Sequence, residues 1–182
     1  MSVTELLREI RLKIARGDFD AAREALLGNA ALAENAEAQA MGARILGYTE
    51  GYALAHNMFL DLEAVWPDNF EVLKMHCQLA QEQGDYNEAI SVARRLLTRF
   101  PTRPDAYETL IDSYELAGKT GEALQLTAEA LAGFPGQPGF LERQNRLSLL
   151  LNRIEISDNN IEEIKSELAC QPLMPDNENI QL

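Results

Sequence analysis

The stretch GDYNEAISVARRLLTRFP, residues 84–101, carries the pattern on which the prediction of the fold rests. The stretch closes with an aromatic residue followed by a proline, Phe100-Pro101. The same kind of pair recurs at a constant interval, with Trp66-Pro67 before it and Phe134-Pro135 after it. Alanines keep the same interval at three positions: Ala55, Ala89 and Ala123. A strict period of about 34 residues indicates a repeated helical hairpin, because the chain lacks the alternating apolar and polar residues that are typical of β-strands.

Length and composition are those of one folded domain. The chain has 182 residues, of which 46% are hydrophobic and 25% charged, which is ordinary for a globular protein. Sixteen basic residues against 29 acidic residues give a net charge of −13. A negative field of this size repels phosphate backbones, so we expect no nucleic-acid partner. It favours a cationic partner, or it serves solubility alone.

Features that would place the chain outside the cytoplasm are not found in the sequence. Cys77 and Cys170 lie far apart and belong to no cluster with metal-ligand spacing, which favours reduced thiols. The first residues lead directly into an amphipathic pattern instead of a signal-type apolar run, and no stretch is long enough to span a bilayer. We therefore expect a cytoplasmic protein that does not insert into membranes.

Apolar residues at helical spacing, punctuated by glycines and prolines, divide the chain into helix pairs. Each hairpin has more apolar surface than its two helices can cover for each other, so neighbouring hairpins must stack. We predict one domain over residues 1–170, made of repeats at 3–33, 36–67, 70–101 and 104–135 and a degenerate repeat at 138–170. Residues 171–182 are predicted to be a flexible tail.

The degenerate last repeat is predicted to contain two helices. The phrase Gly136-Gln137-Pro138 precedes the first of them, because proline is well tolerated in the first turn of a helix. Ser157-Asp158-Asn159-Asn160 reads as a linker, and Asn159 with Glu162 forms a capping-box spacing for the second helix.

The repeated positions make the chain resemble the tetratricopeptide-repeat family, whose units combine large apolar, small and aromatic residues with a closing proline. The fourth unit supplies Tyr107, Leu110, Tyr114, Ala123, Ala130 and Pro135. The third supplies Leu73, Cys77, Ala80, Ala89, Leu96 and Pro101, and the second supplies Ala43, Ala55, Phe59, Leu62 and Pro67. The resemblance covers residues 36–135 well, whereas residues 3–33 need one deletion. It implies an all-α, right-handed superhelical solenoid of antiparallel helix pairs with degenerate first and last repeats.

No arrangement of residues suggests catalysis. His56 and His76 are the only histidines, and neither belongs to an HExxH pattern or has a cysteine or acidic residue at metal-ligand spacing. His76 is predicted to be an ordinary packed helix residue, and Cys77 to fill a tight helix contact. No phosphate-binding loop or Ser-His-Asp set can be identified. We expect no enzyme activity, no cofactor and no metal site.

The resemblance implies that the first helix of each unit lines a concave groove that binds a partner. The corresponding positions are Arg44 and Tyr48 in the second unit, Glu71, Lys74, Gln78 and Gln81 in the third, and Asp105, Glu108, Asp112 and Glu115 in the fourth. The fourth set places four carboxylates on one helical stripe, where like charges repel one another. The stripe predicts a basic peptide or helix as partner. The alternative is a solvated acidic face with the partner bound elsewhere.

The leading prediction is a non-catalytic scaffold or adaptor that binds another protein. Family members that bind chaperone tails hold a terminal carboxylate with cationic side chains and asparagine, whereas this chain has Lys74 followed by Gln78, Asp105 and Thr109. Chaperone-tail binding is therefore not expected. Alternatives are a secretion or assembly chaperone, or an accessory regulatory subunit of an enzyme complex such as one for envelope polysaccharide synthesis. A homodimer could form through an open apolar edge of a terminal repeat, at Leu6, Leu7 and Ile10 or at Leu149, Leu150 and Leu151.

Overall fold

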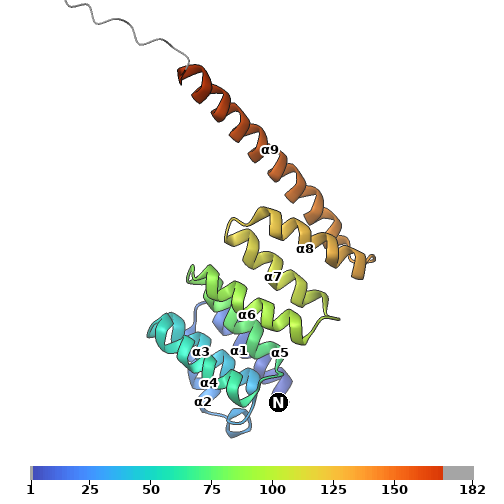
Figure 1. Ribbon diagram of the computed structural model, residues 1–182. Helices are drawn as coiled ribbons and strands as arrows, with labels where there is room; N and C mark the ends of the chain where they lie inside the picture. The colour runs from blue at the N-terminus through green and yellow to red at the C-terminus, as the bar shows by residue number, and fades with distance from the viewer. Residues whose placement is uncertain (1, 170–182) are drawn as a thin grey trace, which may run out of the picture.

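The computed structural model describes residues 2–169, and over this range the chain folds entirely into helices and connecting loops (Figure 1). The all-α prediction is therefore confirmed. The elements are α1 (Val3–Ala15), α2 (Phe19–Leu27), η1 (Ala30–Leu32), α3 (Ala36–Thr49), α4 (Tyr52–Val65), α5 (Phe70–Glu82), α6 (Tyr86–Arg99), α7 (Pro104–Leu116), α8 (Thr120–Gly133) and α9 (Pro138–Ala169).

Local chemistry fixes where the paired helices begin and end. Ser2 forms a capping box with Glu5, and Asn35, Asn69 and Asp85 accept hydrogen bonds from backbone N–H groups of the first turns of α3, α5 and α6. Between the helices of a pair the chain reverses at a glycine: Gly17, Gly84 and Gly118 have φ of 75°, 77° and 71°. Glycine adopts this left-handed conformation without steric cost, so the reversal is encoded in the sequence.

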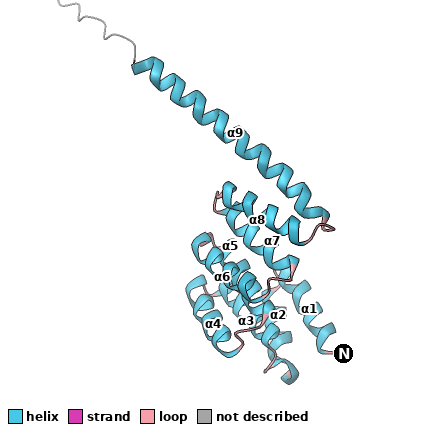
Figure 2. Cartoon of the chain, turned by 45° about the vertical axis from the view of Figure 1, so that its right-hand side comes forward, coloured by secondary structure: helices cyan, strands magenta, loops and turns pink. Residues whose placement is uncertain are grey.

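The helix pairs stack into two layers. The first helices α1, α3, α5 and α7 contact one another in series, and each second helix packs between its own first helix and the first helix of the next pair (Figures 1 and 2). The predicted alanines Ala55, Ala89 and Ala123 are fully buried, which permits close approach of the paired helices. Phe100 packs edge to face on Phe70, at 5.3 Å between ring centroids, so the aromatic before the proline closes its hairpin.

The last repeat differs from the prediction. Residues 157–160, expected to be a linker, lie inside the single helix α9, so the described part of this repeat is one long helix. Serine, aspartate and asparagine lower helix propensity only modestly, and the sequence has no glycine or proline between residues 140 and 169. The amino-terminal part of α9 packs on α8, and the remainder projects away from the stack (Figure 2). The predicted tail at 171–182 lies outside the described residues.

The two apolar edges considered for self-association behave differently. Leu6, Leu7 and Ile10 are buried against the neighbouring helices, so the prediction of an open amino-terminal edge is wrong. Leu149 and Leu150 on α9 are 66% and 40% exposed. Within residues 2–169, no helix combines the length and apolar character needed to cross a membrane.

Candidate functional site: a groove along the first helices

The predicted partner-binding residues gather in two adjoining hollows along the layer of first helices. The larger, of about 480 Å³, is lined by the predicted residues Arg44, Tyr48, Glu71, Lys74 and Gln78 together with Arg11 and Glu82. The smaller, of about 200 Å³, is lined by Lys74, Gln78, Gln81, Asp105, Glu108, Thr109 and Asp112. Lys74 and Gln78 belong to both, so the hollows form one groove over α1, α3, α5 and α7. Of the ten predicted residues, Glu115 alone lines neither hollow.

The α3–α5 end of the groove contains a compact polar cluster. Arg44 donates a hydrogen bond of 2.9 Å from Nε to the Tyr48 hydroxyl, and both side chains contact the Glu82 carboxylate. Burial, helped by the hydrogen bond to Glu82, raises the pKa of Tyr48. Glu82 was not predicted, although it follows Tyr48 by one full repeat period and so occupies the same repeat position.

Arg11 of α1 is the second groove residue that the sequence prediction missed. It pairs with Glu37, and its guanidinium lies 3.8 Å from the Glu71 carboxylate. Because these two glutamates are also separated by one repeat period, the period places both on the groove. The first, degenerate repeat therefore contributes a cation to this end.

In the middle of the groove, the charged side chains are only loosely paired. Lys74 Nζ lies 3.9 Å from the Asp105 carboxylate, which Arg103 approaches to 3.3 Å. Gln81 donates to the Ser113 hydroxyl at 2.8 Å, so its amide is directed toward α7. The Glu108 carboxylate forms no ion pair with the residues that the structure describes. A partner could engage Lys74 and Glu108 without breaking a short contact.

At the α7–α9 end the acidic stripe is already paired. Arg143 of α9 contacts Asp112 at 2.7 Å and Glu115 at 3.6 Å, and Arg146 contacts Glu115 at 2.8 Å. Burial raises the pKa of Asp112, and the charge and hydrogen bond of Arg143 offset only part of this effect. The expectation that these two carboxylates face an outside partner therefore needs correction, because two arginines of the chain's own helix α9 already contact them.

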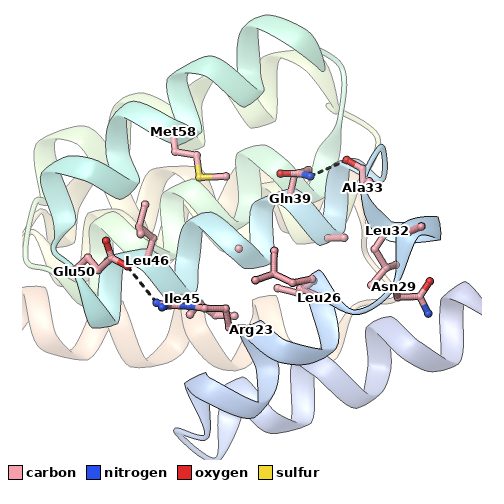
Figure 3. Close-up of a pocket in the computed structure, with 14 residues that line it drawn as sticks. Arg23, Leu26, Asn29, Leu32, Ala33, Gln39, Ile45, Leu46, Glu50 and Met58 are labelled. Atoms are coloured by element: carbon pink, nitrogen blue, oxygen red, sulfur yellow. Dashed lines mark hydrogen bonds and ion pairs between the residues drawn. The ribbon is translucent and has the colours of Figure 1, made fainter.

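A separate apolar hollow of about 460 Å³ lies between α2, η1, α3 and α4 (Figure 3). Leu26, Ile45, Leu46 and Met58 contribute to its wall. Polar groups at its edge are engaged within the chain, since the Gln39 amide donates to the Ala33 carbonyl at 2.7 Å. The hollow does not join the groove residues described above.

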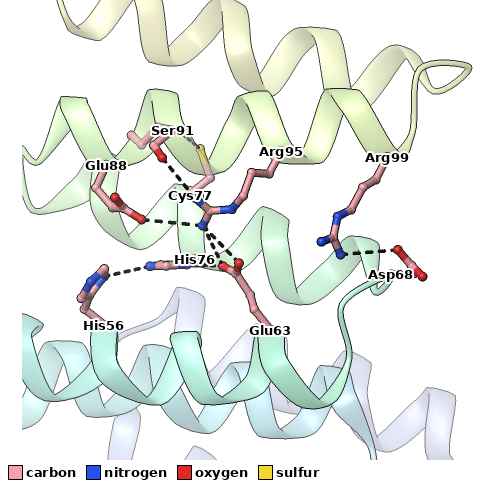
Figure 4. A network of polar contacts seen from close by, with 10 residues as sticks. His56, Glu63, Asp68, His76, Cys77, Glu88, Ser91, Arg95 and Arg99 are labelled. Atoms are coloured by element: carbon pink, nitrogen blue, oxygen red, sulfur yellow. Dashed lines mark hydrogen bonds and ion pairs between the residues drawn. The ribbon is translucent and has the colours of Figure 1, made fainter.

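His76 is packed, as the sequence predicted, but it also belongs to a polar network that the sequence did not predict. His76 is fully buried, contacts Glu63 through Nδ1 at 2.6 Å and contacts His56 Nδ1 through Nε2 at 3.0 Å (Figure 4). Arg95 lies 3.1 Å from the same Glu63 carboxylate. These residues come from α4, α5 and α6, so their proximity cannot be read from spacing along one helix.

The fold and groove define a helical-repeat scaffold, a class in which stacked hairpins present an extended concave surface. The family model for the tetratricopeptide repeat matches residues 74–138. The matched residues 74–138 therefore contain tetratricopeptide repeats, and such repeats typically serve as non-catalytic protein-interaction scaffolds. A comparison with curated proteins found no matching sequence.

Solved structures with this fold include proteins of different kinds. MamA from Desulfovibrio magneticus RS-1, residues 41 to the end, superposes with a TM-score of 0.58 at 15% identity, covering 92% of this chain and 97% of that chain. PilF from Pseudomonas aeruginosa gives a TM-score of 0.62 at 19% identity, covering 93% and 77%. Naa15, in a complex with Naa10 bound to HypK, gives 0.63 at 14% identity, covering 95% and 26%. At these identities the likeness shows the fold.

Proposed function

We propose that this chain is a non-catalytic scaffold or adaptor that binds a segment of another protein in the groove over α3, α5 and α7. The observation that supports the proposal is the continuity of the two hollows through Lys74 and Gln78. A groove that crosses several repeats suits an extended peptide or a single helix, which can contact each first helix in turn.

The charges in the groove favour a partner segment that carries basic residues toward α7. Glu108 and the loosely held Asp105 offer carboxylates there, and the net charge of −13 adds a long-range attraction for cations. Arg143 and Arg146 show how arginines from a neighbouring helix engage this stripe. At the α3–α5 end, Arg44 and Lys74 accompany the acidic residues, so the segment needs acidic or polar residues there.

The test is affinity capture from native lysate with the double variant Gln78→Lys and Glu108→Lys. Its matched control is Gln125→Lys and Glu129→Lys on α8, which changes the net charge equally at exposed positions outside the groove. We expect the groove variant alone to lose the partner, at unchanged melting temperature. A partner retained by both variants would contradict binding in the groove.

The same capture separates the narrower versions of the proposal. A secreted or assembling polypeptide as partner supports a secretion or assembly chaperone, whereas an enzyme supports an accessory regulatory subunit. Both versions place the protein in the cytoplasm, and Cys77 suits that environment as a buried free thiol.

Self-association through α9 is a second candidate, favoured by a stripe of apolar residues at heptad spacing. Phe140 and Leu147 on this stripe are each 1% exposed, but Ile154 and Ile161 are 46% and 47% exposed. A heptad stripe is the pattern by which two helices pack along a seam. A second copy of α9 would cover the exposed half and produce a homodimer.

Sedimentation equilibrium of the full chain tests this candidate, with Ile154→Glu and Ile161→Glu as the seam variant. The control is Asn152→Glu and Arg153→Glu, which adds acidic charge to neighbouring exposed positions of the same helix. A dimer that only the seam variant dissociates supports the candidate. A wild-type chain that is monomeric at high micromolar concentration excludes it.

A further inference from the structure

Three side chains with metal-ligating atoms converge from three different helices. His56 on α4, His76 on α5 and Glu88 on α6 place one nitrogen or carboxylate oxygen each within 4.8 Å of the others. The two imidazoles are closest, with 3.0 Å between His56 Nδ1 and His76 Nε2 (Figure 4). The cluster joins the second repeat to the third, on the side of α5 that faces α4 and α6.

The orientation of His76 is fixed on every side. Its ring is fully buried and stacks on Phe59, with 4.9 Å between centroids and an interplanar angle of 1°. Its Nδ1 lies 2.6 Å from the Glu63 carboxylate, which accepts the Nδ1 proton. In a neutral imidazole with the proton on Nδ1, Nε2 carries the lone pair, and this nitrogen points toward His56.

Glu63 is itself held in place, because Arg95 lies 3.1 Å from its carboxylate. A carboxylate that accepts the far proton of a histidine is the usual outer partner of a metal-ligating imidazole, because it sets the tautomer and raises the basicity of the ligand nitrogen.

We propose that His76 Nε2, His56 Nδ1 and the Glu88 carboxylate form a binding site for a divalent transition metal, with Zn²⁺ as the expected ion. Two imidazoles and one carboxylate are a ligand set that Zn²⁺ accepts in tetrahedral geometry, with water in the fourth position. The inference is independent of the proposed partner groove. A bound ion would tie α4, α5 and α6 together and so fix the angle between repeats two and three.

The two imidazole nitrogens already lie close to the separation that Zn²⁺ requires. Zinc–nitrogen bonds of about 2.0–2.1 Å in a tetrahedral site set the two nitrogens about 3.4 Å apart, so the imidazoles separate by only a few tenths of an ångström. Glu88 is half-buried, and its pairing with Arg95 is long at 3.7 Å, so the carboxylate is free to turn toward the ion. Without a metal, His56 Nδ1–H donates directly to His76 Nε2, which is the competing explanation of the 3.0 Å contact.

The experiment is calorimetric titration of the full, tag-free chain with Zn²⁺, together with thermal unfolding with and without the ion. Variants His56→Gln and Glu88→Gln each remove one ligand, while fully buried His76 is left unchanged so that the core stays intact. Glu122→Gln is the matched control, since Glu122 occupies in the next repeat the position that Glu88 occupies in its own. All proteins carry Cys170→Ser, so that this thiol cannot contribute to the measured Zn²⁺ binding.

We expect the wild-type chain and Glu122→Gln to bind one equivalent of Zn²⁺ with a rise in melting temperature. His56→Gln and Glu88→Gln should each weaken binding at least about tenfold, because a lost ligand costs no less than a lost outer partner. Absence of Zn²⁺ binding by the wild-type chain overturns the proposal and leaves the direct hydrogen bond between the histidines. Equal affinity in Glu122→Gln and in either ligand variant also overturns it.

Discussion

The two ends of the groove share one repeat position, held by Arg44 at one end and by Asp112 at the other, yet they differ in what occupies them. At the α3–α5 end, Arg44, Tyr48 and Glu82 surround a hollow of about 480 Å³. At the α7–α9 end, Asp112 and Glu115 already hold Arg143 and Arg146. A stripe of carboxylates on one first helix can therefore be assigned to partner binding only when the contacts of the following first helix are known. In this protein that helix is α9, and its arginines contact the carboxylates of α7.

The largest effects on stability are expected at the helix contacts beneath the two ends. These contacts test whether the two ends rest on the same packing. Ala89 lies under the α5–α6 contact and Ala123 under the α7–α8 contact, and both are fully buried. Leucine at either position should overpack its contact and lower the free energy of unfolding by about 1–3 kcal/mol. Urea denaturation measures the change, with Ala128→Leu on the exposed face of α8 as control. A leucine tolerated at one position but not at the other would show that the two ends rest on different packing.

The coupling free energy of ion pairs should also differ between the α7–α9 end and the middle of the groove, but by a smaller amount. A double-mutant cycle of Asp112→Ala with Arg143→Ala should give a coupling free energy of about 0.5–1 kcal/mol, because the pair is short and partly buried. The same cycle for Lys74 and Asp105, which are 3.9 Å apart and more loosely held, should give about 0.3 kcal/mol or less. Equal couplings would remove the distinction between the occupied α7–α9 end and the loosely paired middle of the groove.

The pH dependence of Asp112 gives the smallest expected effect. Its folded-state pKa is raised, with burial as the main cause, so between the ordinary and the raised pKa the folded chain holds a proton that the unfolded chain has released. Stability contributed by this group is present at low pH and is lost as the pH rises through that window. Wild type should therefore lose stability relative to Asp112→Asn over this range, as followed by urea denaturation at a series of pH values. A relative gain by wild type would mean that Arg143 outweighs burial.

The repeat period of the sequence predicted the all-helical fold, and nine of the ten predicted site residues line the two hollows. The resemblance to the tetratricopeptide-repeat family implied which positions of a first helix line the groove. The period then carried that assignment from one hairpin to the next, because equivalent positions in stacked hairpins point the same way. The period also relates Glu82 to Tyr48 and could have placed Glu82 in the groove, but the prediction did not use that relation. The period could not predict α9, since the last repeat departs from it and only weak helix breakers occur near residue 158.

Contacts between helices were the other part that could not be predicted. Arg143 reaches Asp112 and Glu115 from a different helix, and His76 likewise meets Glu63 and His56 from a neighbouring one. Such contacts depend on how far each helix is rotated about its axis relative to its neighbours. Hydrophobic spacing defines the buried face of a helix, but it does not decide which polar side chains meet at the margin of that face.

Photo-crosslinking in native lysate tests most directly whether the groove binds the partner. A photo-reactive phenylalanine analogue replaces Gln78, which lines both hollows, and in a second protein it replaces Gln125, which is exposed on α8. We expect a discrete crosslinked partner from position 78 and none from position 125. A partner crosslinked from position 125 alone would contradict binding in the groove and would place the interaction on the layer of second helices.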